Sequence, residues 1–491
     1  MKKILALVLA LIMVMGLATT ASAAGTATIS VAATDSHSYE VYQILTGTLE
    51  DGKLVDVALG TNGKLPENTT LAQALAELEA NKDAADTAAL AVILKYVDLE
   101  STPKGTVSNS APMTVDTGYY LLKDLGPLSE NESLSLYVVE VVDSVTVNPK
   151  RGTIIPEKKV DDINDSDLAD LEANKDNEDS ADYDIGDEVP FTLKATLPAN
   201  YADFKVYKLV FHDEASEGLT FNADSVKVYL NTIADANLIA ADKYTLVTDP
   251  ADDCTFEVNF ADLKVSVPSA AAGSNIIVKF TATLNDQAAL GAVGNSNEMY
   301  LEFSNDPNWV PDPDAETPPP PPTGKTPEDK VVVFTYQVVV NKVDEEKNPL
   351  VGATFTLFKW DDTTDTWVSL GAIEGTNQST FQWPGVDDGK YKLEETKAPT
   401  GYNKLAPIEF EITASHDEEA ADPKLTVLNG GNMFQGDVAT GNLTAQIENL
   451  PGAVLPETGG VGTTLFYIIG GLLVAAAVVL LVTKKRMASA E

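Results

Sequence analysis

Short runs of alternating apolar and polar residues fill the chain between its two ends. They include TATISVAA at 26–33, VPFTLKATL at 189–197, IIVKFTATL at 276–284, VVVFTYQVVV at 331–340 and LTAQIENL at 443–450. A period of two predicts strands that bury one face. Because turn-forming residues separate these runs, the pattern favours β-sandwiches and a mainly β chain.

One segment departs from this pattern. Residues 71–97 are rich in Ala, Leu and Glu, and the apolar residues Leu71, Leu75 and Leu78 follow helical spacing. Strand patterns return at 118–125 and 134–147. The sequence therefore predicts a first β domain over 24–150 with a helical insertion.

Two further strand-rich units follow. Residues 151–310 form the predicted middle domain and 331–450 the third, with 311–330 as a proline-rich linker. The run Pro318–Pro322 within that linker favours stiff polyproline II, which acts as a spacer; a docking ligand for a partner is the alternative.

Both ends of the chain have the composition of targeting segments. Lys2 and Lys3 precede an apolar stretch, and Ala21-Ser22-Ala23 fits a signal-peptidase site, so residues 1–23 are predicted to be a signal peptide. Within the last segment, 451–491, residues 465–482 are uncharged and mostly apolar, and the basic TKKR follows. This predicts one transmembrane helix with a cytoplasmic tail.

Charge and residue counts exclude several classes of protein. The 491 residues carry a formal net charge of -41, which disfavours binding to nucleic acid. There is one cysteine, Cys254, interpreted as a small core residue, so no intrachain disulfide can form. The three histidines, His37, His212 and His416, have no ligand spacing, and we predict neither a metal site nor a cofactor.

A short motif precedes the C-terminal apolar segment. It consists of Leu455, Pro456, Glu457, Thr458 and Gly459. With the apolar segment and the basic tail, it resembles the cell-wall sorting signal of Gram-positive surface proteins. The resemblance implies that a sortase cleaves between Thr458 and Gly459 and holds the threonyl carbonyl as a thioester.

The stretch YKLEETKAPTGY at 391–402 is the most informative internal motif. It resembles the E-box of CnaB-type domains in Gram-positive pilins and adhesins. The resemblance implies that Glu395 catalyses an intramolecular amide bond between a lysine and an asparagine.

Strand alternation identifies the partners of Glu395. Lys342 shares a strand face with Val338 and Val340, and Asn449 shares one with Ile447, so both polar residues should point inward. Burial disfavours the ammonium form of a lysine, and the neutral amine is a nucleophile. We therefore expect a Lys342–Asn449 bond, with Asn442 as the second candidate acceptor and a Lys342–Glu395 salt bridge as the alternative.

The middle domain resembles the CnaA-type domains of the same pilins. The resemblance rests on PEKKVDD, FHDEASEGLTF and GNSNEMYLEFSNDPN. It implies a bond between Lys158, or Lys159, and Asn297, with Asp213 as the catalytic carboxyl group. Asn295 lies on the same strand face as Asn297 and stays a candidate.

A lysine between the first two domains completes the pattern. The stretch SVTVNPKRG resembles the pilin motif, with Asn148 in the place of its tyrosine. Pro149 ends the preceding strand and should expose Lys150 at the domain junction. The Lys150 amine would attack the thioester at Thr458 of another subunit; a solvated linker lysine is the alternative.

The chain is thus similar to SpaA-type major pilins, with tandem immunoglobulin-like (Cna-type) domains. The resemblance implies a wall-anchored extracellular pilus subunit whose partners are pilin-type and housekeeping sortases, identical subunits, peptidoglycan, minor pilins and host receptors. A wall-anchored adhesin that stays single is the alternative. A wall-bound enzyme is disfavoured because no paired carboxylates stand out.

Overall fold

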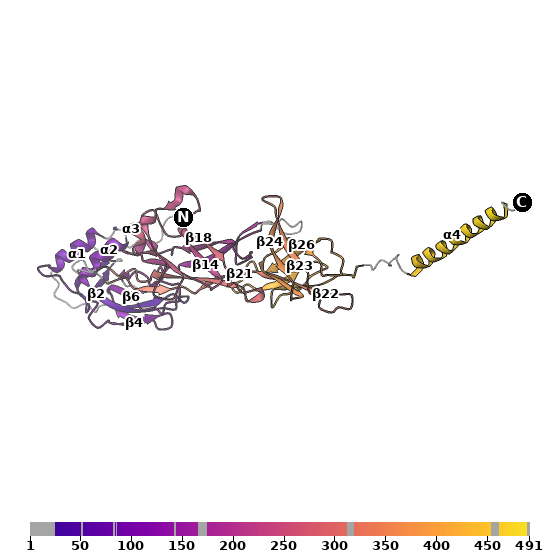
Figure 1. The fold of residues 1–491 in the computed structure, drawn as a ribbon. Coiled ribbons are helices and arrows are strands. Elements are labelled where there is room, and N and C mark those ends of the chain that lie inside the picture. Colours follow the sequence, from indigo (N-terminus) through magenta and orange to yellow (C-terminus); the bar gives the residue numbers. More distant parts are fainter. Residues whose placement is uncertain are drawn as a thin grey trace.

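The computed structural model describes residues 25–50, 53–81, 84, 86–141, 144–164, 174–311, 319–452 and 461–488. Figure 1 shows an elongated molecule in which three β units follow one another in chain order, with a helix beyond the third. The predicted fold class is confirmed: the chain is mainly β, arranged as successive β-sandwich domains with one long apolar C-terminal helix.

The N-terminal domain contains two sheets and the helical insertion. In one sheet β1 (Thr26–Val31) lies between β5 (Met113–Asp116) and β8 (Val145–Val147). The other contains β2 (Ser38–Glu50), β3 (Lys53–Leu59), β4 (Gly105–Ser108), β6 (Gly118–Asp124) and β7 (Val138–Val141). The predicted helical segment forms α1 (Leu71–Ala80) and α2 (Asp86–Ile93), and a capping box between Thr70 and Gln73 satisfies the first amides of α1.

The middle domain is a sandwich of two larger sheets. One has the order β10 (Asn174–Glu178), β9 (Ile155–Ile163), β12 (Glu188–Thr196), β18 (Asn275–Leu284), β14 (Leu219–Leu230), β15 (Leu238–Ile239). The other has the order β11 (Ser180–Asp182), β21 (Asp329–Phe334), β19 (Asn295–Ser304), β13 (Leu209–Ala215), β17 (Phe256–Phe260), β16 (Thr245–Val247). The short helix α3 (Leu263–Ser266) follows β17.

The third domain is also a two-sheet sandwich. Its first sheet has the order β25 (Thr380–Val386), β22 (Tyr336–Val343), β30 (Asn442–Glu448), β29 (Gln435–Asp437). Its second has the order β24 (Thr366–Glu374), β23 (Thr354–Asp361), β26 (Gly389–Lys397), β27 (Ile408–His416), β28 (Leu425–Asn429). The first and last long strands, β22 and β30, run parallel and adjacent.

The boundary between the last two domains differs from the expected linker. Part of the region expected as a free spacer forms β20 (Thr323–Lys325), which pairs with β19, and β21 also pairs with β19. Val331 and Val333 of β21 pack in the core of the middle domain, whereas Val332 and Phe334 pack in that of the third. By its hydrogen bonding the strand belongs to a sheet of the middle domain, and its other face contributes to the third. Residues 312–318 of the expected linker lie outside the described residues.

The C-terminal helix α4 (Val461–Ala488) stands apart from the β domains (Figure 1). Its segment Thr464–Met487 is long and apolar enough to cross a membrane, and none of it is buried against protein. The basic residues Lys485 and Arg486 lie in its last turn. The predicted signal peptide and the LPETG motif fall outside the described residues.

Candidate functional site

The third domain brings together the lysine, glutamate and asparagine that the sequence singled out. Lys342 is near the end of β22, Glu395 is on β26 of the facing sheet, and Asn449 directly follows β30. The parallel register of β22 and β30 pairs Lys342 with Ile447, and the backbone N–H of Asn449 donates to the Val343 carbonyl at 3.1 Å. All three side chains are buried between the sheets.

Lys342 sits at this site without a carboxylate partner in hydrogen-bond contact. Its Nζ donates to the carbonyl oxygens of Val343 at 3.0 Å and Ile447 at 2.8 Å. The Val343 carbonyl also accepts a hydrogen bond from the backbone N–H of Asn449. Burial lowers the pKa of Lys342 to about 8, and the nearby Glu395 charge only partly opposes that shift. A substantial fraction of the side chain is therefore the neutral amine near physiological pH.

The Asn449 amide is held against the glutamate. Its Nδ2 donates to both carboxyl oxygens of Glu395, at 3.0 and 3.1 Å, and to the Asn403 carbonyl at 2.9 Å. The Asn403 carbonyl requires a donor, which fixes the orientation of the amide. The Leu405 amide holds Glu395 at 2.8 Å, and Asn449 Oδ1 is buried without a hydrogen-bond partner. The potential leaving nitrogen thus contacts the carboxyl group.

The structure distinguishes Asn449 from the second candidate, Asn442. Asn442 pairs with Gln337 at the opposite end of β22 from Lys342 and is only half-buried. Asn449 contacts Glu395, and its backbone N–H shares the Val343 carbonyl with the Lys342 Nζ.

A second buried set lies in the middle domain. Lys158 on β9, Asp213 on β13 and Asn297 on β19 are all fully buried, and the Lys158 ammonium donates to Asp213 Oδ2. The rings of Phe191 and Phe280 each lie 5.6 Å from the Lys158 Nζ. Lysine, carboxyl group and asparagine are again enclosed between two sheets.

Electrostatics and hydrogen bonding both mark this set as unusual. Burial lowers the pKa of Lys158 and raises that of Asp213, and the attraction between the two groups opposes each shift. Asn297 lies close enough to Asp213 to lower its pKa, yet among the described residues neither of its amide atoms, nor Asp213 Oδ1, has a hydrogen bond of ordinary geometry. Unsatisfied buried polar groups are costly, and they often mark a site with a chemical role.

The alternative residues in the middle domain have other contacts. Lys159 points to the opposite side of β9 and donates to Asp179 at 2.7 Å. Asn295 bonds to the backbone of Ala289 and Val333. Of the candidate pairs, Lys158 and Asn297 are therefore the two that lie with Asp213.

The N-terminal domain has a different kind of buried polar network. His37 Nδ1 lies 2.7 Å from Asp124 Oδ1, while Asp35 accepts from Tyr39 at 2.8 Å and from Arg151 at 2.6 Å. Among the residues whose burial is described in this domain, no lysine is buried.

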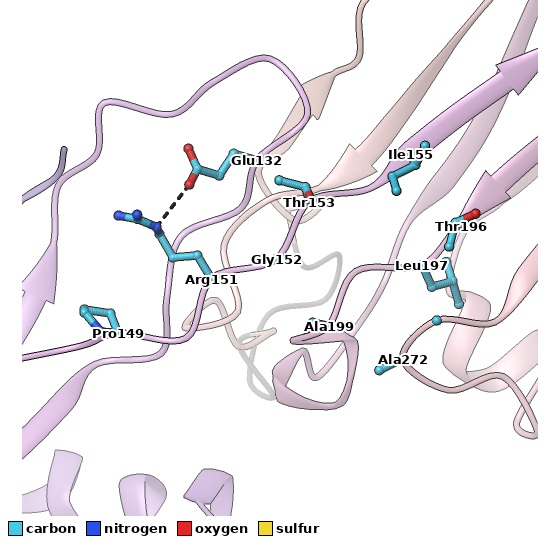
Figure 2. A pocket seen from close by; sticks show the side chains of 11 residues that line it. Glu132, Pro149, Arg151, Gly152, Thr153, Ile155, Thr196, Leu197, Ala199 and Ala272 are labelled. Carbon is cyan, nitrogen blue, oxygen red and sulfur yellow. Dashed lines mark ion pairs between the residues drawn. The ribbon is translucent and has the colours of Figure 1, made fainter. Parts of the chain in front are cut away.

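Lys150 lies where the first domain meets the second. It is exposed, follows β8 after Pro149, and precedes Arg151, whose guanidinium turns inward to Glu132 at 3.0 Å. Figure 2 shows this ion pair at the edge of a cavity, to which Pro149 and Arg151 contribute from the first domain's end. The rest of the lining comes mainly from the middle domain, including Thr196, Leu197 and Ala272.

In the part of the chain that the structure describes, two histidines lie in groups of ligand-type side chains. His212 lies with Asp252 and Cys254, and His416 lies with Asp162 and Asp182. Sequence spacing does not indicate these groups, because each histidine stands on a strand that is distant in the sequence from its neighbours.

Comparisons with protein families match three parts of the chain. A model described as a SpaA prealbumin-like fold domain matches residues 336–424, and one described as the Cna-B-like domain of Gram-positive pilin backbone subunit 2 matches 185–307. The LPXTG cell wall anchor motif matches 451–489. The middle domain is thus described as Cna-B-like, and its assignment to the CnaA type stays a prediction.

Individual proteins are also similar to this chain. The trypsin-resistant surface T6 protein of Streptococcus pyogenes serotype M6 is 32% identical over 241 residues, which span 47% of this chain and 42% of that protein. The structure of the T6 backbone pilin of the same serotype, described as having three modular domains, matches at a TM-score of 0.52 and 18% identity, covering 87% of this chain and 98% of that one. The full-length major pilin SpaD from Corynebacterium diphtheriae matches at a TM-score of 0.48 and 17% identity, covering 88% and 98%.

Proposed function

We propose that this chain, which combines pilin backbone domains with an LPXTG cell-wall anchor and is homologous to a T6 surface protein, is the backbone subunit of a Gram-positive pilus. Internal lysine–asparagine amide bonds stiffen each subunit, and sortase joins Thr458 of one subunit to Lys150 of the next. The protein is a structural subunit without catalytic turnover. Its partners are sortases, further copies of itself and peptidoglycan, with minor pilins and host receptors as further partners.

The observation that carries the proposal is the recurrence of one buried set in two domains. Each set has a lysine, a carboxyl group and an asparagine enclosed between two sheets. A salt bridge alone would need no asparagine, and burying its charges would give little net stability. An amide bond converts the buried amine into a neutral amide N–H and releases the asparagine nitrogen as ammonia, while the asparagine carbonyl oxygen stays.

The bond-forming step is an acyl transfer from nitrogen to nitrogen. The neutral Nζ of Lys342 attacks the Asn449 Cγ, the C–Nδ2 bond breaks, and one ammonia molecule leaves. Glu395 contacts Nδ2, so it is suited to take the proton that Lys342 loses and deliver it to the departing nitrogen. Asp213 would serve Lys158 and Asn297 in the same way.

Polymerisation uses an exposed lysine instead of a buried one. Lys150 is exposed and therefore reachable by a sortase that carries Thr458 as a thioester. Attack by the amine forms an amide and releases the sortase thiol. A lysine at the joint between the first and middle domains and a reactive carboxyl end after the third domain make a contact between two different surfaces, which grows as a filament because it does not close.

Electrophoresis of cell-wall extracts tests this proposal. Wild-type protein boiled in detergent should give a ladder of covalent multimers, and Lys150→Ala should reduce it to the single subunit. Lys205→Ala, which removes an exposed lysine of the middle domain, serves as the matched control and should leave the ladder intact. A wild-type protein that runs only as a monomer would favour the single adhesin, and a ladder that survives Lys150→Ala would move the linkage to another residue.

A further inference from the structure

The joint between the middle and third domains contains a buried group of ligand-type side chains. Asp162 on β9 and Asp182 on β11 belong to the middle domain, and His416 ends β27 of the third. One ligand atom from each lies within 4.8 Å of the others. The side chains of Asp162 and His416 are 11% and 7% exposed, and Asp182 is 3% exposed.

Hydrogen bonding fixes the state of the histidine. The Ser180 hydroxyl donates its one hydrogen to the Asp417 carbonyl at 2.7 Å, so it must accept from His416 Nδ1 at 2.8 Å. In the neutral ring, Nδ1 then carries the hydrogen and Nε2 carries the lone pair. The lone pair of Nε2 therefore faces the Asp162 carboxylate at 3.7 Å. A metal-binding histidine typically has its other nitrogen held in this way.

The two carboxylates have few partners for buried charges. Asp162 Oδ1 accepts from the Asp182 backbone N–H at 3.4 Å, and the Tyr336 hydroxyl lies close to Asp182. Among the described residues, Asp182 Oδ2 has no hydrogen bond of ordinary geometry. Asp162 and Asp182 lie close to each other, and Asp388 is a third carboxylate near Asp162. Lys175 and Lys359 act on the group from nearby, but Lys175 is paired with Glu418 and Lys359 with Asp184 and Asp387.

We propose that Asp162, Asp182 and His416 bind one divalent transition-metal ion, of the class of Zn²⁺ or Mn²⁺, that fastens the third domain to the middle domain. Two carboxylates and one imidazole suit these ions better than Ca²⁺, which prefers oxygen ligands alone. The charge of the ion offsets both carboxylates, and Nε2 supplies a neutral third ligand. A proton shared between the two aspartates is the competing account of the same geometry.

The ion would add a further connection at this joint. Hydrogen bonds already link the domains there, from Ile185 to Gly385 at 3.1 Å and from Asp387 to Asp184 at 3.0 Å. Because the ligands come from both domains, binding should couple their unfolding. This inference is independent of polymerisation and of the amide bonds.

Metal titration of the full chain in detergent, after removal of metals with a chelator, tests the proposal. Calorimetric titration with Zn²⁺ and with Mn²⁺ at pH 7.5 should show one saturable site, and Asp182→Asn and His416→Gln should each weaken it by at least roughly tenfold. Asp252→Asn is the matched control: it removes a carboxylate from the other histidine cluster and should leave the site intact.

X-ray absorption of the wild-type zinc complex gives a readout that does not depend on any variant folding. It should show one imidazole with oxygen ligands and no sulfur. Absence of saturable binding of either ion would leave the shared proton as the explanation and overturn the proposal. A sulfur ligand, or binding lost in Asp252→Asn but kept in Asp182→Asn, would overturn it in favour of the cluster that contains Cys254.

Discussion

At the scale of single residues, the hydrogen-bond partners of a buried lysine decide whether it can act as an ion-pair partner or as a nucleophile. Lys359 is 3% exposed, yet it donates to Asp184 at 2.8 Å and to Asp387, so two carboxylates stabilise its charge. Lys342 is also buried, and the hydrogen bonds described for its Nζ go to two backbone carbonyls. One of these carbonyls also accepts from the backbone N–H of Asn449. The same side chain is thus an ion-pair partner in one place and a candidate nucleophile in the other.

The role of Glu395 gives the first prediction at this scale. Because its carboxyl group contacts the leaving nitrogen of Asn449, Glu395→Ala should prevent the bond in the third domain but not in the middle domain. Intact-mass measurement of wild-type protein should show a deficit of about 17 Da per bond, or about 34 Da for two. The variant should show a deficit of about 17 Da from its own calculated mass.

Glu394 provides the control for that measurement. It is the neighbour of Glu395 on β26, points to the other side of the strand and lies 3.7 Å from Lys404. Glu394→Ala should keep the full deficit. Equal deficits in the two variants would mean that Glu395 is not required.

The lowered pKa of Lys342 predicts a pH dependence in protein that cannot form the bond. In Asn449→Ala the lysine stays buried, with a folded pKa of about 8 against an ordinary value of 10.5. Between these two values the unfolded chain binds more protons than the folded one, so the free energy of unfolding should rise as pH increases through this window. Denaturant unfolding at several pH values measures the rise.

The control for this pH effect is the double variant Lys342→Met, Asn449→Ala, which has no amine at the site. The rise of the single variant between pH 8 and 10.5 should be absent from it, because the two values belong to Lys342. Identical pH profiles for the two variants would contradict a buried, neutral lysine.

At the scale of elements, the amide bond would connect the first and last long strands of the third domain. Alternation alone predicted that Lys342 and Asn449 face inward, because each apolar face ends in that residue. It could not show that β22 and β30 run parallel, since pairing partners distant in sequence leave no local signal. That register is what separates Asn449 from Asn442.

The same limit explains the difference at the domain boundary. The sequence predicts that the VVVFTYQVVV run begins the third domain, but β21 and β22 are consecutive strands in the sheets of different domains. Both have buried apolar faces, and composition does not say against which sheet each packs. The group of Asp162, Asp182 and His416 at the joint leaves no sequence signal for a related reason, because its members meet only when β9, β11 and β27 are in place.

Loss of the connection between β22 and β30 should lower the stability of the third domain. The bond would close a loop of roughly 100 residues, for which the cross-link entropy model gives about 4–5 kcal/mol. Lys342→Met removes the amine and keeps an apolar stem of similar length, so this loss should dominate its effect. Calorimetry of the third-domain transition measures it.

Lys347→Met is a suitable comparison for that experiment. Lys347 is exposed and pairs with Glu448 at 2.5 Å, and surface pairs of this kind contribute at most about 1 kcal/mol. Its transition should stay within a few degrees of wild type. If Lys342→Met unfolds no earlier than this control, the wild-type domain carries no cross-link.

At the scale of the whole molecule, three sandwiches in line are connected by two joints of different character. The first joint includes backbone and amide hydrogen bonds, from Leu134 to Asn305 at 2.8 Å and from Asn308 to Ser135 at 2.9 Å, and the ion pair of Arg151 with Glu132. The second contains buried charged groups, among them Lys359 with Asp184 and Asp387. A filament that transmits load along its axis would pass that load through both joints and through each domain between them.

The distribution of buried lysines along this axis leads to a last prediction. Lys158 in the middle domain and Lys342 in the third are the lysines of the proposed amide bonds. The residues of the N-terminal domain whose burial is described include no buried lysine. That domain relies on the network around Asp35, His37 and Asp124, which is non-covalent. We therefore expect it to unfold at the lowest temperature of the three and to be the first region cleaved by a protease during heating.

Calorimetry combined with timed proteolysis and mass mapping measures this order. In wild type the first cuts should fall within residues 24–150. In a variant that lacks both proposed bonds, Lys158→Met with Lys342→Met, the two later transitions should move down while the first keeps its temperature, because mutations in separate domains act independently. A wild-type N-terminal domain that outlasts the other two would show that the covalent bonds do not set the stability order of the filament's subunit.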